Sequence, residues 1–129
     1  MRELLYVFIG GGTGAVIRYC ASLFWRHLQL HPHYSGIIFP WPTLIVNVIG
    51  CLLISLFYSF GERWGFSAET RLMLTTGFCG GLTTFSTFSY ETISLVQGGH
   101  YMTALLYVML SLAIGTAAII LPFLQVSGK

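Results

Sequence analysis

The sequence predicts an all-α integral membrane protein, and its composition and length lead to this fold class. Of the 129 residues, 55% are hydrophobic and 8% are charged, with no aspartate. Soluble domains carry about 25% charged residues, so this chain could not cover a water-facing surface. At about 20 residues per membrane crossing, the length allows four transmembrane helices and no separate soluble domain.

The apolar segments predict single helices over residues 4–25, 42–60, 70–96 and 101–124. Pro42 suits the first turn of the second helix. Ser67, followed by Ala68 and Glu69, suits the N-cap of the third. Because the turn at residues 97–100 is short, the third and fourth helices are expected to be antiparallel neighbours.

The charge bias that sets membrane orientation is weak. With four spans, both termini and the second loop lie on one side of the membrane. That side carries Arg2, Arg63, Arg71 and Lys129, against Arg26 and at most Arg18 on the other. We therefore expect the chain to insert in both orientations.

The third span contains an unusual stretch at residues 77–89, GFCGGLTTFSTFS. Glycine and threonine are poor helix formers, so this helix is expected to break near its middle. Such a break frees backbone carbonyls around Gly80 to Thr83, which either pair locally or bind a cation. The same small residues also fit a packing seam between helices, and spacing alone leaves seam and pore open.

Aromatic rings and hydroxyls follow the glycines of this stretch. Phe85 and Phe88 are three residues apart and share one helix face. An aromatic ring is positive at its edge, so two rings presented edge-on stabilise a small anion. Glu91 is a carboxylate at membrane depth and hence a functional candidate, as partner of a helix terminus or of a pore donor. Further hydrogen bonds to an anion are available from the hydroxyls of Thr83, Thr84, Ser86 and Thr87.

The other spans each contribute polar side chains. Asn47 either holds two helices together or presents its N–H donors to a pore. Arg18 either reaches a lipid headgroup or places a positive charge at an aqueous vestibule. Tyr107, Ser111 and Gly115 follow at intervals of four and form one face of the fourth helix.

Several other functions find little support. Gly10, Gly12 and Ala15 match a dinucleotide fingerprint, but that site needs an acidic residue about 20 positions on, and none occurs between Glu3 and Glu62. Gly10 and Gly14 instead fit close helix packing. No nucleophile, base and orienting acid can be assembled from four glutamates and four mostly loop-placed histidines, so no enzyme is predicted. A net charge of +2 without a basic cluster gives no footprint for nucleic acid.

Three blocks of sequence resemble the Fluc (CrcB) fluoride channels over essentially the whole chain. They are GGGTGAVIRY at 10–19, TLIVNVIG at 43–50 and GFCGGLTTFSTFSYE at 77–91. The resemblance implies four-helix subunits that assemble as antiparallel, dual-topology homodimers with two fluoride pores in the lipid bilayer. It implies passive fluoride export across the bacterial inner membrane, which lowers cytoplasmic fluoride and gives resistance.

The resemblance also assigns roles in the pore. Phe85 and Phe88 are implied as the fluoride-facing rings, and Asn47 as a pore-lining donor. Tyr107 and Ser111 are implied to continue the polar track on the fourth helix.

A metal site and a vestibule are implied as well. The backbone carbonyls of Gly80 and Thr83 from both subunits are expected to hold a structural sodium ion at the dimer centre, and Arg18 to lie near the vestibule. Two positions depart from the family pattern. Pro42 stands where glycine is common, which affects the vestibule, and Gly115 stands where some members carry serine, which affects the polar track.

The main rival is a small multidrug exporter, which also has four spans and dual topology. Such an exporter needs a buried carboxylate in the first span, where this chain has Arg18 and only Glu3 at the edge. A membrane scaffold without transport gives no account of the phenylalanine pair beside the expected break.

Overall fold

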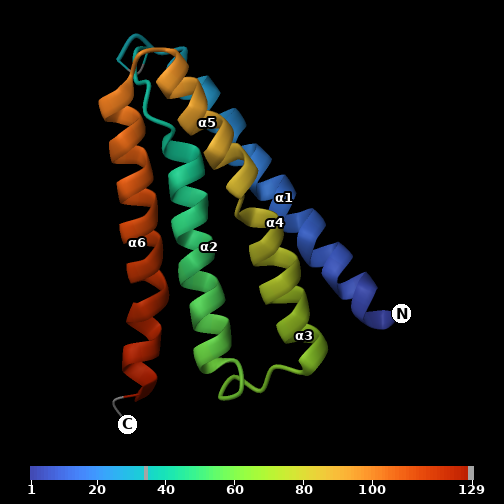
Figure 1. Ribbon diagram of the computed structural model, residues 1–129. Helices are drawn as coiled ribbons and strands as arrows, with labels where there is room; N and C mark the ends of the chain where they lie inside the picture. The colour runs from blue at the N-terminus through green and yellow to red at the C-terminus, as the bar shows by residue number, and fades with distance from the viewer. Residues whose placement is uncertain (34, 128–129) are drawn as a thin grey trace.

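The computed structural model describes residues 1–33 and 35–127, which form helices joined by short connections (Figure 1). No strand occurs among these residues, and the all-α prediction is confirmed. The elements are α1 (Arg2–Gln29), α2 (Trp41–Phe60), α3 (Ala68–Leu72), η1 (Met73–Cys79), α4 (Gly80–Leu82), α5 (Phe85–Gln97) and α6 (Tyr101–Ser127). The segment η1 is a π-helix, which has a wider turn than an α-helix.

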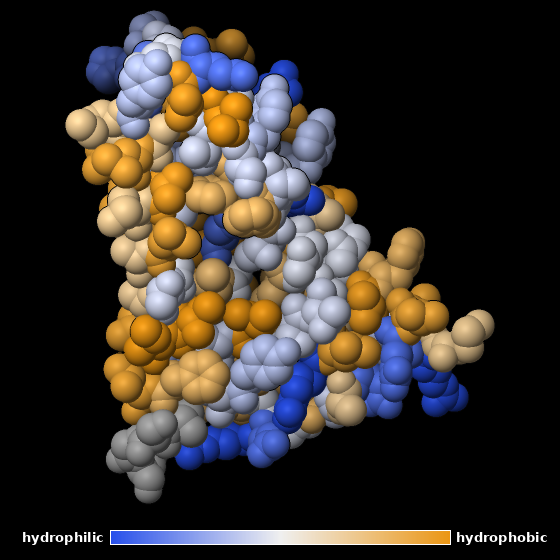
Figure 2. All heavy atoms as spheres, in the orientation of Figure 1, coloured by the Kyte–Doolittle hydropathy of each residue, from blue (hydrophilic) through white to orange (hydrophobic). Residues whose placement is uncertain are grey.

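Three of these helices, α1, α2 and α6, are long and apolar enough to cross a membrane. They coincide with the first, second and fourth predicted spans, and α1 and α6 extend a few residues beyond the predicted bounds. The third predicted span is a succession of α3, η1, α4 and α5. Figure 2 shows hydrophobic atoms along the sides of the face in view and hydrophilic atoms toward its two ends.

Helices α6 and α2 lie side by side, with α3, η1 and α4 beyond α2 and α1 crossing behind α5 (Figure 1). The start of α1, the end of α6 and the α2–α3 loop lie in the lower half, and the α5–α6 turn lies at the top (Figure 1). The predicted antiparallel pairing of α5 with α6 is confirmed. Lys129, which the charge count included, lies outside the described residues.

Two of the predicted helix starts are confirmed. Pro42 occupies the first turn of α2. The Ser67 side chain accepts a hydrogen bond from the Thr70 N–H at 3.1 Å, which caps α3. Hydrogen bonds from the Glu69 backbone and the Ser67 side chain hold the pKa of the Glu69 carboxyl below its ordinary value.

Glycines form a seam where α1 meets η1 and α4. A Cβ on Gly10 would collide with the Met73 carbonyl oxygen, and one on Gly14 with that of Phe78. From the other side, a Cβ on Gly77 would lie 3.0 Å from the Gly10 Cα. The seam is therefore real, and it occupies one face of the third segment. Because Gly10 and Gly14 lie inside a continuous helix, they do not form the strand-to-helix turn of a dinucleotide site.

The third segment breaks at Thr83 and Thr84, near the middle of the predicted span as expected, although the glycines that suggested a break are not part of it. Thr83 has φ −81 and ψ 156, and Thr84 has φ −152 and ψ 120, both extended conformations. Gly80 and its neighbour Gly81 remain helical in α4. Threonine is β-branched and suits extended backbone, whereas the glycines are used for close packing.

We predict that Gly14→Ala destabilises the protein by about 1–3 kcal/mol, because the added methyl overpacks the seam. The matched control is Gly12→Ala, since a Cβ on Gly12 meets nothing within 4 Å. Thermal unfolding of both variants in detergent measures the difference. Equal melting temperatures for the two variants would show that the seam does not limit stability.

Candidate functional site

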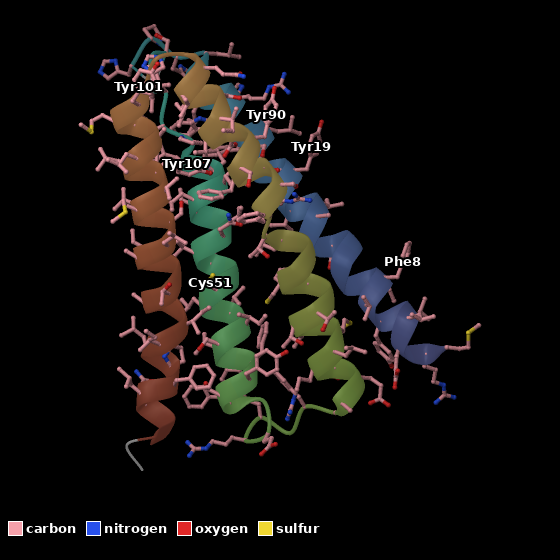
Figure 3. All side chains as sticks on the ribbon, viewed as in Figure 1. Phe8, Tyr19, Cys51, Tyr90, Tyr101 and Tyr107 are labelled. Carbon is pink, nitrogen blue, oxygen red and sulfur yellow. The ribbon has the colours of Figure 1, made fainter. Side chains whose placement is uncertain are left out.

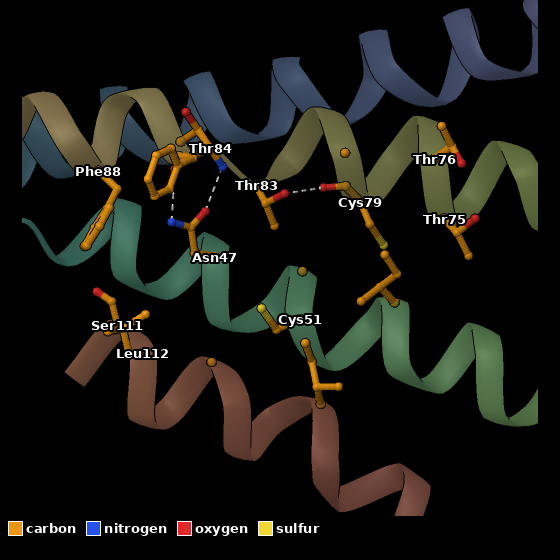
Figure 4. A pocket seen from close by; sticks show the side chains of 16 residues that line it. Asn47, Cys51, Thr75, Thr76, Cys79, Thr83, Thr84, Phe88, Ser111 and Leu112 are labelled. Carbon is orange, nitrogen blue, oxygen red and sulfur yellow. Dashed lines mark hydrogen bonds between the residues drawn. The ribbon is translucent and has the colours of Figure 1, made fainter. Parts of the chain in front are cut away.

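The Asn47 side chain on α2 holds the break in place. Its Nδ2 donates to the Thr84 carbonyl oxygen at 3.2 Å, and its Oδ1 accepts from the Thr84 N–H at 2.8 Å (Figure 4). The Thr84 Oγ1 in turn accepts from the Thr87 N–H at 3.2 Å and caps α5. Asn47 thus joins two helices, as one of its two predicted roles required, and keeps one N–H for another partner.

These bonds take donors away from two carbonyls of the third segment. In a continuous α-helix the Thr84 N–H would bond to Gly80 and the Thr87 N–H to Thr83. Here the first donor goes to Asn47 and the second to the Thr84 hydroxyl. The Gly80 and Thr83 carbonyls are therefore two of those that the break deprives of helical donors.

A cavity of about 520 Å³ opens beside the break and brings most of the predicted site residues together. Its walls come from α2, η1, α4, the break, α5 and α6. Figure 4 shows Asn47, Thr84, Phe88 and Ser111 around its left half. The predicted residues that line it are Asn47, Gly80, Thr83, Thr84, Phe85, Phe88 and Ser111.

The two phenylalanines differ in their surroundings. Their ring centroids lie 5.9 Å apart with an interplanar angle of 38°. Phe88 packs on Tyr107 with centroids 5.1 Å apart, whereas Phe85 is 80% exposed. Across the cavity, the Ser111 Oγ is buried and has no hydrogen-bond partner within the described part of the chain. Its hydroxyl is available to a ligand.

Glu91 is the centre of a hydrogen-bond cluster. Its Oε1 accepts from the Thr43 hydroxyl at 2.8 Å, and its Oε2 accepts from the Tyr107 hydroxyl at 2.6 Å. Tyr107 is fully buried and points inward from α6 (Figure 3). Neither Tyr107 nor Glu91 lines the cavity. Tyr107 packs behind Phe88, which does line it. Sequence reasoning missed Thr43, since no local spacing connects it with residues of α5 and α6.

A second cavity of about 260 Å³ adjoins the first and contains the predicted vestibule residue. Arg18 and Thr87 line it together with Pro42, and Thr84 lines both cavities. Pro42, one of the two departures from the family pattern, is thus part of this wall. Gly115, the other departure, lines the larger cavity, where a Cβ would lie 3.7 Å from the Cys51 sulfur.

Comparison with known proteins assigns the chain to one family. A family model described as CrcB-like protein, Camphor Resistance (CrcB), matches residues 5–123. The chain belongs to the CrcB family.

Three curated relatives share one name. The chain is 48% identical over 120 residues to the "Fluoride-specific ion channel FluC" of Bacteroides fragilis, covering 93% of this chain and 92% of that protein. It is 51% identical over 108 residues to the protein of the same name from Pyrococcus furiosus, covering 82% and 80%. For the Phocaeicola vulgatus protein the identity is 42% over 122 residues, covering 94% and 95%.

We predict that Tyr107→Phe lowers the free energy of unfolding by about 1–3 kcal/mol, because it leaves a half-buried Glu91 oxygen without its donor. Tyr90→Phe is the matched control, since Tyr90 is 75% exposed, and it should change stability by no more than about 0.5 kcal/mol. Chemical or thermal unfolding in detergent compares the two. A Tyr107→Phe protein as stable as the control would show that the cluster does not hold α5 to α6.

Proposed function

We propose that this protein is a fluoride-selective channel that exports fluoride passively across the bacterial inner membrane and so confers fluoride resistance. The observation that carries the proposal is the cavity at the break. Two phenylalanine rings line it together with Asn47 and Ser111, which both have hydrogen-bond donors to spare. The fluoride channels among its curated relatives support the assignment.

The cavity offers what a small, strongly hydrated anion needs when it loses water. The second N–H of Asn47 and the Ser111 hydroxyl replace water donors, and the Phe88 and Phe85 edges supply further positive potential. The Thr84 hydroxyl donates to the Thr87 Oγ1 at 3.0 Å, and the Thr87 hydroxyl extends the donors toward the vestibule that Arg18 lines. Selectivity follows from a passage that fits fluoride but not the larger chloride.

Four membrane spans follow if the third segment crosses as one unit of α3, η1, α4 and α5. Its break would be unfavourable against lipid, where backbone polar groups need partners. We infer that a second, antiparallel copy covers it. The 80% exposure of Phe85, the exposed Gly80 and the weak charge bias support a dual-topology homodimer with two pores.

The same face fits a structural sodium ion at the dimer centre. The Gly80 and Thr83 carbonyls are two of those that lose helical donors at the break, and free carbonyls of this kind suit a hard cation that takes oxygen ligands. Two such carbonyls from each subunit would hold the ion, and its charge would bind the two breaks together. Within the described residues, no three His, Cys, Asp or Glu side chains converge as an alternative metal site.

The purified protein in liposomes should release fluoride down its gradient and release chloride far more slowly. An ion-selective electrode records each anion after the membrane potential is clamped with a potassium ionophore. Equal chloride and fluoride fluxes, or none of either, would refute the channel.

In the same assay, changing both Phe85 and Phe88 to Ile should abolish fluoride flux while the dimer stays assembled. Isoleucine keeps apolar bulk but has no positive ring edge. Changing the exposed Phe123 on α6 to Ile is the control and should leave flux unchanged. Full flux through the double variant would mean that the rings do not face the ion.

Sodium should stabilise the assembled protein. A site filled at 100 times its dissociation constant adds about 2.7 kcal/mol, so the melting temperature in sodium should exceed that in N-methyl-D-glucamine. Identical melting temperatures, or a well-ordered structure without density among the Gly80 and Thr83 carbonyls, would remove the sodium site.

A further inference from the structure

A third cavity continues the path beyond the site. It has a volume of about 340 Å³ and shares Thr75 and Thr76 with the site cavity. The vestibule cavity shares Thr84 with the site cavity at its other end. Figure 4 shows Thr84 and Thr76 toward opposite ends of the site cavity. The three cavities therefore follow one another, and the third is lined by Tyr58, Ala68, Arg71, Leu72, Thr75 and Thr76.

Each end of this series carries one arginine. Arg18 lines the first cavity and Arg71 lines the third. No acidic side chain lines either of them in the part of the chain that the structure describes. Both outer cavities thus present positive charge to a diffusing anion, which raises its local concentration.

The charge of Arg71 is only weakly compensated. Its Nη2 lies 3.6 Å from the Glu62 Oε1, and the Glu62 side chain is 85% exposed. The Arg71 side chain is 33% exposed, but solvent around Glu62 and the 3.6 Å separation keep the pair weak. The Arg71 Nε is buried and, across the described residues, has no hydrogen-bond partner. The guanidinium therefore keeps donor capacity that the protein itself does not use.

Hydroxyl groups complete the wall around Arg71. The Thr75 Oγ1 donates to the Arg71 carbonyl oxygen at 2.9 Å, which ties the start of η1 to α3. Tyr58 and Thr76 line the cavity and are exposed, so their O–H groups are accessible to a small anion. This set of one cation and two hydroxyls is suited to an anion, and the guanidinium charge disfavours a cation.

We propose that Arg71, with Tyr58 and Thr76, forms an anion-binding mouth at the end of the path opposite Arg18. The inference rests on the proposed function and adds a site to it. The Arg71 charge attracts fluoride, which then moves to the Thr76 hydroxyl, because Thr76 lines the site cavity as well. A passive channel works in both directions, and an arginine at each mouth serves entry from either side.

Fluoride efflux from phosphatidylcholine liposomes at subsaturating fluoride tests the mouth. Arg71→Gln should slow the initial rate by about 3- to 10-fold at low ionic strength and by less at high ionic strength, since screening removes charge steering. Arg71→Lys keeps the charge and should retain most of the rate. Glu62→Gln removes the competing carboxylate and should raise the rate. The matched control is Arg63→Gln, because Arg63 lies over the Phe60 ring and lines none of the three cavities.

The outcomes separate this inference from the channel itself. Absence of flux from the unmodified protein would refute the proposed function. If the unmodified protein conducts fluoride but Arg71→Gln and Arg63→Gln have the same initial efflux rate at both ionic strengths, the Arg71 mouth alone is overturned. A defect confined to liposomes that contain phosphatidylglycerol would assign Arg71 to a lipid headgroup and overturn it too. If Arg71→Gln fails to assemble, the efflux rates of Thr76→Val and Glu62→Gln test the mouth instead. Rates equal to that of the unmodified protein in both variants would overturn the proposal.

Discussion

The two hydrogen bonds that join the Asn47 side-chain amide to the backbone N–H and C=O of Thr84 determine the geometry of the site. They hold Thr84 extended, so α4 ends and α5 starts in a new direction with Phe85 at its first position. They also divert the donor that Gly80 would receive and leave the Thr84 hydroxyl to cap α5. Removing the amide would leave polar groups of a buried peptide unit unpaired, at about 1–3 kcal/mol for each.

The third segment serves two functions on its two faces. Gly77 and Gly81, four residues apart, turn toward α1, where a Cβ on Gly81 would collide with the Gly11 carbonyl oxygen. Gly80, with no atom within 4 Å of a Cβ, turns to the opposite face with Thr83. The sequence left two interpretations of this stretch open, a packing seam between helices and a pore, because both require small residues. The helical register of the glycines assigns one face to each.

Local signals predicted much of this fold, and contacts between distant residues determined the rest. Hydropathy gave the long helices to within a few residues, and Ser67 marked its cap correctly. The break lies near the middle of the third span as predicted, but Thr83 and Thr84 form it, because the poor helix propensity of the glycines was outweighed by their close packing along the seam. The Glu91 cluster joins residues 48 and 16 positions away, so no periodicity within one helix could reveal it.

One protomer leaves the site incomplete on the side of Phe85. The ring is 80% exposed, and the Gly80 and Thr83 carbonyls near it lack their helical donors. Lipid cannot satisfy such groups, and a hydrated surface at this depth would allow ions of many sizes to pass. The proposed second copy, meeting the first at the break, would answer both constraints. It would pair the carbonyls around the proposed cation and close the cavity against Phe85, so selectivity and assembly would depend on the same few atoms.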